Sequence, residues 1–118
     1  MKTQAKTLSI FLMSCFLITG CSKDEVTDLR SSADIIYEKA TNSMENGNYR
    51  NATNYLEVLT TSFPFSNQAK QAQLDLIFAH YRSSSFEEAI DEAKQVEKEN
   101  PTQPRVDYAL YMRGLALF

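Results

Sequence analysis

A short pattern of residues occurs twice in this chain, 37 positions apart. The pattern is an aromatic residue, an alanine three positions later and a more distant proline: Tyr49, Ala52 and Pro64, then Phe86, Ala89 and Pro101. A fixed period of this length is typical of folds in which one supersecondary unit stacks on the next. Because each unit buries its apolar face only against a neighbour, the period limits the fold to a repeat array.

Apolar residues within each unit recur every three or four positions, which is the period of an amphipathic helix. The sequence contains no sustained alternation of apolar and polar residues, so it predicts no strand. Five helices are expected: from Ser31 or Ser32 to Gly47, from Asn48 to before Pro64, from about Asn67 to Ser83, from Ser84 or Ser85 to Asn100, and from about Val106 to Phe118. The sequence therefore predicts an all-α solenoid of antiparallel helix pairs, with about two and a half repeats.

The third predicted helix is apolar on two faces. One face carries Ala69, Ala72, Leu76 and His80, and the other carries Leu74, Ile77, Phe78 and Tyr81. A helix of this kind is expected to pack between neighbours. Small residues are expected where helices cross, at Ala40, Ala52, Ala89 and Gly114. After this helix, Ser84 with Glu87 and Ser85 with Glu88 both have the spacing of a capping box.

These features resemble the tetratricopeptide repeat, whose period is about 34 residues, with three extra residues in the connection before the third helix. The last helix, ALYMRGLALF, would leave much apolar surface bare. Since a natural array ends in a polar capping repeat, we expect this chain to be part of a longer array, truncated in its third repeat.

The first twenty residues have the features of an export signal. Lys2 and Lys6 precede an apolar run over 8–17, which is shorter than the ~20 residues of a membrane-spanning helix. The segment from Leu17 to Cys21 (LITGC) resembles a lipobox, in which the thiol of Cys21 carries diacylglycerol. The alternative is a buried core helix with an unmodified cysteine. Cys15 would leave with the signal, so no disulfide is expected within the mature chain.

Cleavage after residue 20 would leave ten basic and fifteen acidic residues, a net charge of −5. This charge argues against binding to nucleic acid. It also means that acyl chains, and not a basic patch, must hold the protein to a membrane. The polar residues 21–31 are expected to form a lipidated flexible tether, followed by the helical domain over 32–118.

Two further segments resemble the BamD family, the repeat-containing lipoproteins of the outer-membrane β-barrel assembly machine. The first runs from Phe63 to Ser66 and then over 73–81 (QLDLIFAHY); the second covers 100–115 (NPTQPRVDYALYMRGL). Segment 47–50 (GNYR) adds to the resemblance. The resemblance to this family implies a lipid anchor at the periplasmic face of the outer membrane. Ser22, which follows the cysteine, agrees with that location. The resemblance also implies binding of unfolded outer-membrane β-barrel proteins at their C-terminal signal, and docking to BamA and BamC mainly through later repeats.

Candidate binding residues lie in and near the predicted loop between the second and third helices. Phe63, Pro64 and Phe65 could form a rigid apolar seat for an aromatic-ended peptide, because proline limits the entropy lost on binding. Ser66 follows in the same segment, where the family often has glycine. Arg50 could pair with a peptide carboxylate through its planar guanidinium. The alternatives are a hydrophobic plug for the two aromatic residues and a solvated helix start for Arg50.

Other polar residues favour structural roles. His80 has no second histidine or cysteine nearby to complete a metal site, and it is expected to pack partly buried. Carboxylates in the fourth helix have no basic or nucleophilic partner at a defined spacing: Glu87, Glu88, Asp91 and Glu92. Tyr108, Tyr111 and Arg113 are expected to hold helices together. We therefore expect no enzyme activity, cofactor or metal.

Two functions remain open at this level. The first is a scaffold lipoprotein that binds unfolded outer-membrane proteins and assists their insertion. The second is a repeat lipoprotein that recruits cell-wall enzymes in the periplasm. The same anchor and helix pairs would serve both, because a repeat array by itself indicates only protein binding.

Overall fold

The computed structural model describes residues 23–99, 101, 102 and 104–118, and the backbone alone over 23–31. It contains five helices: α2 (Lys23–Glu45), α3 (Tyr49–Ser62), α4 (Asn67–Arg82), α5 (Phe86–Glu99) and α6 (Val106–Leu117). No strand occurs among these residues, so the predicted all-α class is confirmed. The predicted signal peptide and Cys21 lie outside the described residues.

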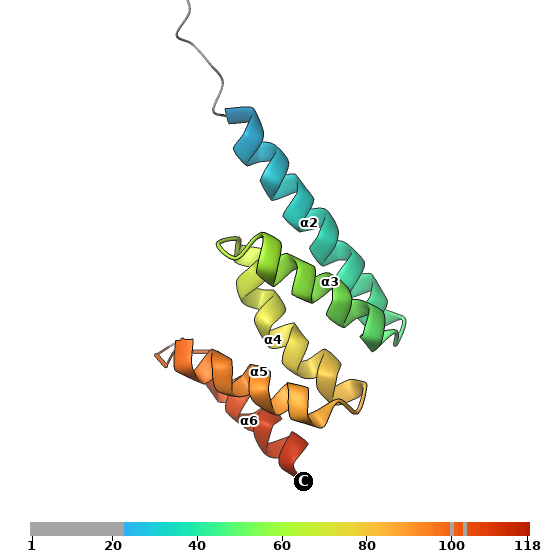
Figure 1. Cartoon of the computed structure of the whole chain (residues 1–118), viewed down its shortest axis with the longest axis vertical. Coiled ribbons are helices and arrows are strands. Elements are labelled where there is room, and N and C mark those ends of the chain that lie inside the picture. The colour runs from blue at the N-terminus through green and yellow to red at the C-terminus, as the bar shows by residue number, and fades with distance from the viewer. Residues whose placement is uncertain (1–22, 100, 103) are drawn as a thin grey trace, which may run out of the picture.

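Each helix packs against the next one and is joined to it by a short connection. The helix pairs follow one another in a staggered row (Figure 1). Helix α4 contacts all four others, since α2 and α6 lie beside it as well as its direct neighbours α3 and α5. This is the sandwiched position that its two apolar faces predict. The α2–α3 and α4–α5 hairpins are the two repeats, and α6 is the first helix of the third.

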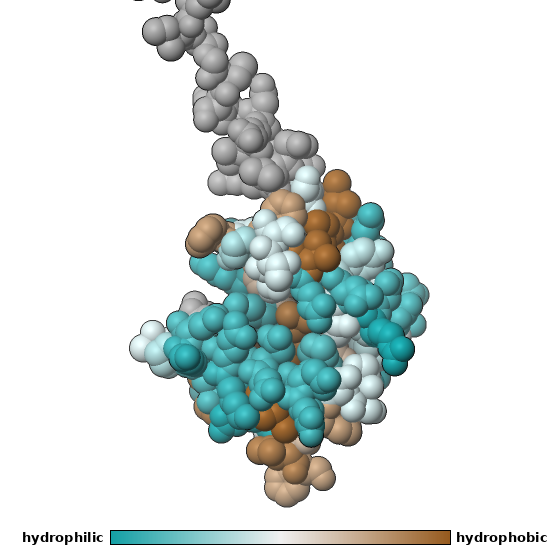
Figure 2. Space-filling model, in the orientation of Figure 1, coloured by the Kyte–Doolittle hydropathy of each residue, from teal (hydrophilic) through white to brown (hydrophobic). Residues whose placement is uncertain are grey.

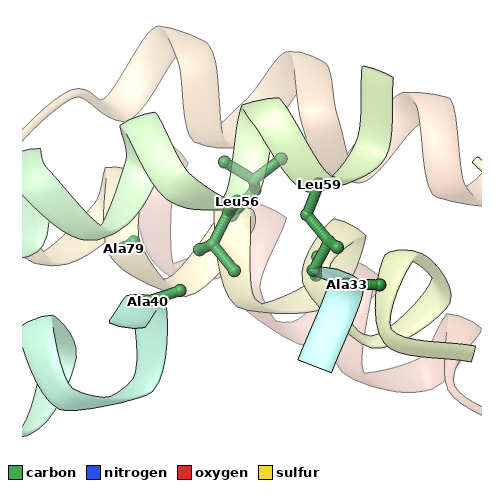
Figure 3. Close-up of a cluster of buried hydrophobic side chains, with 7 residues drawn as sticks. Ala33, Ala40, Leu56, Leu59 and Ala79 are labelled. Carbon is green, nitrogen blue, oxygen red and sulfur yellow. The ribbon is translucent and has the colours of Figure 1, made fainter. Parts of the chain in front are cut away.

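The first hydrophobic cluster joins α2, α3 and α4. Leu56 and Leu59 of α3, both fully buried, point toward small residues on the other two helices (Figure 3). Those small residues include Ala33 and Ala40 of α2 and Ala79 of α4. Alanine at these positions lets the helix backbones come close enough for the leucines to fill the space between them.

The second cluster joins α4, α5 and α6. It contains Leu74, Ile77, Ala89, Ala93, Val96, Ala109 and Met112, with Phe78 and Tyr81 packed against it. Helix α4 thus contributes Ala72 and Leu76 to one cluster and Leu74 and Ile77 to the other. This division agrees with the two faces read from the sequence, and it makes α4 the element that couples the two repeats.

Helix α2 begins earlier than the sequence indicated. It starts at Lys23, whereas we expected an N-cap at Ser31 or Ser32 after a flexible tether. Residues 23–32 contain neither glycine nor proline, so nothing in the chain stops the helix from extending through this polar stretch. The role of residues 21–31 as the tether of a lipid anchor stays a prediction.

Both hairpin turns contain one residue in the left-handed conformation. Gly47 has φ +73° and Ser84, 37 positions later, has φ +63°. The N–H of Asn48 donates to the carbonyl of Ser43 at 2.8 Å, and the N–H of Ser85 donates to that of His80 at 2.9 Å. These bonds end α2 and α4 in the same way, as a Schellman motif. Ser84 therefore ends α4 and does not begin α5, so the capping box expected from Ser84 to Glu87 is wrong.

The two turns give opposite predictions for substitution. Gly47→Ala should lower the free energy of unfolding by about 1 kcal/mol, and Ser84→Gly should raise it by about 0.5–1 kcal/mol, because only glycine adopts positive φ without strain. A Cβ at Gly47 would meet no atom within 4 Å, so the effect there comes from the backbone alone. Urea unfolding of both variants measures the difference. Equal shifts of the same sign would contradict this account.

Helix α6 is only partly covered. Its large exposed apolar residues are Tyr108, Leu110, Tyr111 and Leu117, followed by Phe118. Figure 2 shows hydrophilic side chains over α5 and a hydrophobic group at the C-terminal end of α6. A Cβ at Gly114 would meet no atom within 4 Å, so no described residue uses the close approach that glycine permits there.

Arg113 adds a polar link between α6 and α5, as predicted. Its guanidinium donates to Glu97 Oε2 at 2.7 Å, and both side chains are largely shielded. The side chain of Tyr111 is 62 % exposed, so within the described part of the chain the prediction that it holds helices together is wrong. None of the described helices combines the length and the hydropathy needed to cross a membrane.

Candidate functional site

The connection between α3 and α4 is held by hydrogen bonds at both ends. Phe63 ends α3, where its N–H donates to the carbonyl of Leu59 at 3.0 Å. The Ser66 hydroxyl donates to the Phe63 carbonyl at 2.8 Å and accepts from the N–H of Ala69 at 3.0 Å. Ser66 is thus the N-cap of α4 and closes the turn at the same time. These bonds fix the backbone of the loop.

The loop directs its two aromatic residues to different places. Phe63 is half-buried against the first hydrophobic cluster, whereas the side chain of Phe65 is 96 % exposed. Pro64 between them is exposed and restricts the backbone. The two rings therefore lie in different surroundings: Phe63 packs against the first hydrophobic cluster, and Phe65 projects into solvent.

A hollow of about 400 Å³ lies beside Phe65. Its lining includes Asp34 of α2 together with Asn67 and Gln68 of α4. Gln68 donates a hydrogen bond to Asp34, which links the start of α4 to α2. Phe65 therefore lies at the edge of a polar hollow, on a loop whose following helix is hydrogen-bonded to α2.

Arg50 lies far from Phe65. It is exposed in the first turn of α3, and Phe65 follows the last turn of that helix. A helix of this length spans ~20 Å, since each residue rises about 1.5 Å. The two predicted contact residues can therefore belong only to an extended binding surface and not to one pocket.

A groove of about 440 Å³ runs along the side formed by α2, α4 and α6. Helix α2 and the start of α3 supply one wall, and α4 and α6 supply the rest. Its lining is mostly apolar and aromatic, with two carboxylates: Thr41, Met44, Glu45, Tyr49, Asp75, Phe78 and Tyr108. We refer to it as the α2–α4–α6 groove. The sequence predicted a binding role for none of these residues: it placed Tyr49 in the repeat pattern and Phe78 on an apolar helix face, and it assigned Tyr108 to packing.

Asp75 is the centre of a polar network at this groove. Its Oδ2 accepts from the Tyr37 hydroxyl at 2.9 Å, and its Oδ1 accepts from the Gln71 amide at 2.9 Å. Arg105 also donates a hydrogen bond to Gln71. Burial, and next the nearby carboxylate of Asp75, raise the pKa of Tyr37 to about 12. Burial and Asp75 also raise the pKa of Tyr108, so both phenols stay protonated near neutral pH.

Arg82, in the last turn of α4, stacks on the aromatic wall of the groove. Its guanidinium carbon lies 4.9 Å from the centre of the Tyr49 ring and 5.7 Å from that of Phe78. The two rings meet edge to face, with centroids 5.9 Å apart. The sequence carried one signal for this cluster, because Phe78 and Arg82 are four residues apart on a helix and so share a face.

A second hollow, of about 360 Å³, lies where α3 and α5 flank α4, and it is acidic. It is lined by Glu57 and Glu92 among other polar residues. Burial, followed by Glu57, raises the pKa of Glu92. Burial lowers the pKa of His80, which is half-buried as expected. The described residues contain no group of three side chains suited to hold a metal ion.

Comparison with known proteins agrees with this architecture. A family model described as tetratricopeptide repeat matches residues 22–118. The chain is 32 % identical over 112 residues to a Neisseria gonorrhoeae protein named outer membrane protein assembly factor BamD. It is 34 % identical over 106 residues to the protein of the same name from Vibrio cholerae, and 32 % identical over 110 residues to that from Haemophilus influenzae.

These three matches cover 95 %, 88 % and 93 % of this chain, but only 42 %, 43 % and 42 % of the relatives. The chain thus spans about two fifths of the length of the curated relatives that it resembles. The family-model match over residues 22–118 covers all five helices of the described structure.

Proposed function

Because this chain belongs to the tetratricopeptide-repeat family, we propose that it is a protein-binding scaffold that takes part in the assembly of outer-membrane proteins. In this function it binds unfolded outer-membrane β-barrel proteins and assists their insertion. It does so without catalysis, by presenting a fixed surface of stacked helices to a flexible chain. The relatives, all named outer membrane protein assembly factors, support this proposal over the recruitment of cell-wall enzymes.

The observation that carries the proposal is the position of Phe65. The side chain of Phe65 is 96 % exposed, so a large and rigid apolar ring is free to contact a partner. The loop beneath it is already fixed by Pro64 and by both hydrogen bonds of the Ser66 hydroxyl, so little further entropy is lost on binding. Phe65 is thus suited to anchor an apolar segment of an unfolded chain.

Membrane attachment and the partners of the machinery form the remaining part of the proposal. A lipid on Cys21 would hold the repeats at the periplasmic face of the outer membrane. The acidic surface left after signal removal would keep them from binding the anionic lipid surface directly. BamA and BamC are proposed partners, mainly through repeats other than those described above.

Site-specific photo-crosslinking in cells tests this function. A photoreactive amino acid at Phe65 should capture unfolded outer-membrane proteins, and one at Arg50 should capture them when the bound chain extends along α3. Lys94 on α5 is the matched control, because it is exposed and engaged only in a surface pair with Asp91. Phe65→Ala should reduce the capture at Arg50 several-fold, since the two contacts hold the same chain.

Two results would contradict the proposal. One is equal capture at Phe65 and Lys94, which would mean that contacts are made by chance. The other is capture of peptidoglycan hydrolases or neighbouring lipoproteins in place of outer-membrane proteins. The first would remove Phe65 from the site, and the second would favour the adaptor function.

A further inference from the structure

The contacts of α4 with α2 and with α6 are built on the same positions of the 37-residue repeat. We refer to them as the first and the second junction. Gln68, at the start of α4, donates a hydrogen bond to Asp34 of α2, and Arg105, at the start of α6, donates one to Gln71 of α4. Asp34 and Gln71 are 37 residues apart, as are Gln68 and Arg105. A polar pair at the same place therefore ties each repeat to the one before it.

The two junctions differ at another pair of positions. In the first junction, the Tyr37 hydroxyl donates to Asp75 Oδ2 at 2.9 Å. The residues 37 positions further along the chain are Leu74 of α4 and Met112 of α6, and both belong to the second hydrophobic cluster. The first junction thus has a hydrogen bond where the second has two buried apolar side chains.

We infer that the first junction is a hinge of the array, and that the hydrogen bond between Tyr37 and Asp75 holds this hinge closed. When the bond breaks, α2 moves relative to α4 and α6. This motion belongs to the stacked helices themselves, so it goes beyond the proposed function and does not depend on which chain the array binds.

The first junction opens more easily because of what each pair loses when its helices separate. Tyr37 and Asp75 are only half-buried, and Asp75 also lines the groove of about 440 Å³, so water can replace their hydrogen bond. Such an exchange leaves only a small net loss of stability. Leu74 and Met112 are 6 % and 4 % exposed, and their separation would bring buried apolar surface into water.

The other buried contacts of α2 permit this movement. Of the buried residues in the first hydrophobic cluster, α2 contributes only Ala33 and Ala40. Short side chains of this kind allow packed helices to slide by small amounts while their buried faces stay covered, as in shear motions. Met44 and Glu45 of α2 line one wall of the α2–α4–α6 groove. A displacement of α2 therefore changes the width of the groove.

Distances between spin labels test the hinge in the full chain, with Cys15 and Cys21 replaced by alanine. Labels are attached to cysteines introduced at exposed positions. The pair Lys39→Cys and Asn67→Cys spans the first junction, and the pair Asn67→Cys and Tyr111→Cys spans the second as the control. Double electron–electron resonance should give a broad or two-peaked distance distribution across the first junction and a single narrow peak across the second.

An exchange of residues converts the first junction into the second. The double variant Tyr37→Leu with Asp75→Met should narrow the distance distribution across the first junction to the width seen across the second. Either substitution alone should lower the urea concentration at the midpoint of unfolding, because it leaves one polar group without its partner. The two together should restore the midpoint, since a packed apolar pair can replace a buried polar one.

Tyr37→Phe isolates the hydrogen bond, because it removes the hydroxyl and keeps the ring. It should broaden the distance distribution across the first junction further and leave the second unchanged. Glu38→Gln is the matched control, since it alters an exposed residue beside Tyr37 in the same helix. It should change neither distribution. Circular dichroism shows whether each variant keeps the helix content of the original chain.

Equally narrow distributions at the two junctions of the original chain would overturn the inference. So would a first junction that the double variant leaves unchanged. If the double variant does not fold, Tyr37→Phe decides, because an unaltered distribution in that variant would show that the hydrogen bond does not hold the junction. None of these outcomes involves capture at Phe65, so the proposed function is tested separately.

Discussion

Replacing Leu56 with alanine should lower the free energy of unfolding by about 3 kcal/mol, which is the usual cost of removing a fully buried leucine from a core. Leu56 is completely buried between α2 and α4, in the cluster drawn in Figure 3. Its neighbours Ala40 and Ala79 have short side chains, and each belongs to a packed helix. They cannot extend into the space that the substitution opens, so a cavity remains.

The matched control for Leu56→Ala is Val58→Ala in the same helix. Val58 is 47 % exposed, so its loss should change the free energy of unfolding by less than about 1 kcal/mol. Urea denaturation followed by circular dichroism measures both. Because α4 belongs to both clusters, loss of Leu56 should also weaken the second repeat, and unfolding should remain a single transition. Similar values for the two variants would contradict the position of the core described here.

Replacing Cys21 with alanine should abolish stable attachment to the membrane in the native host. If the thiol carries a diacylglycerol, each buried CH₂ group contributes about 0.8 kcal/mol to membrane binding, and the substitution removes this whole contribution. The described helices include none that could cross a bilayer. After cell fractionation, the original chain should be found in the outer-membrane fraction, from which only detergent extracts it. The Cys21→Ala variant should be found in other fractions.

Cys15→Ala is the control for the Cys21 prediction, since Cys15 lies in the apolar run that would be cleaved away. It should leave membrane attachment and the mass of the mature protein unchanged. Mass spectrometry of the mature chain provides a second readout, because an acylated Cys21 adds the mass of its lipid. An unmodified Cys21 in a processed chain would exclude the lipid anchor while leaving the helical repeats unaffected.

The helices could be predicted because the information for them is local. Gly47 as the end of α2 and Asn48 as the N-cap of α3 are both found where the sequence placed them. The two apolar faces of α4 indicated its central position, since the spacing of apolar residues along a helix determines which sides need cover. The repeat of 37 residues even extends to the paired left-handed turns at Gly47 and Ser84. The early start of α2 was missed because a polar segment without glycine or proline resembles a tether and a solvated helix equally.

The candidate site depended on contacts across the fold. The sequence named Phe63 and Phe65 together, and only the structure separates them, because the loop backbone decides which ring faces the core. Tyr37 meets Asp75 across 38 positions, a pairing that no local pattern indicates.

In this protein the sequence alone determined the helices, their exposed and buried sides and the order of their stacking, because each depends on residues a few positions apart. The tertiary structure decided how closely and in what register the hairpins pack. That packing brings Tyr49 of α3 against Arg82 of α4 and forms a groove among α2, α4 and α6. Such juxtapositions follow from the volumes of side chains buried between whole helices, which no short stretch of sequence encodes.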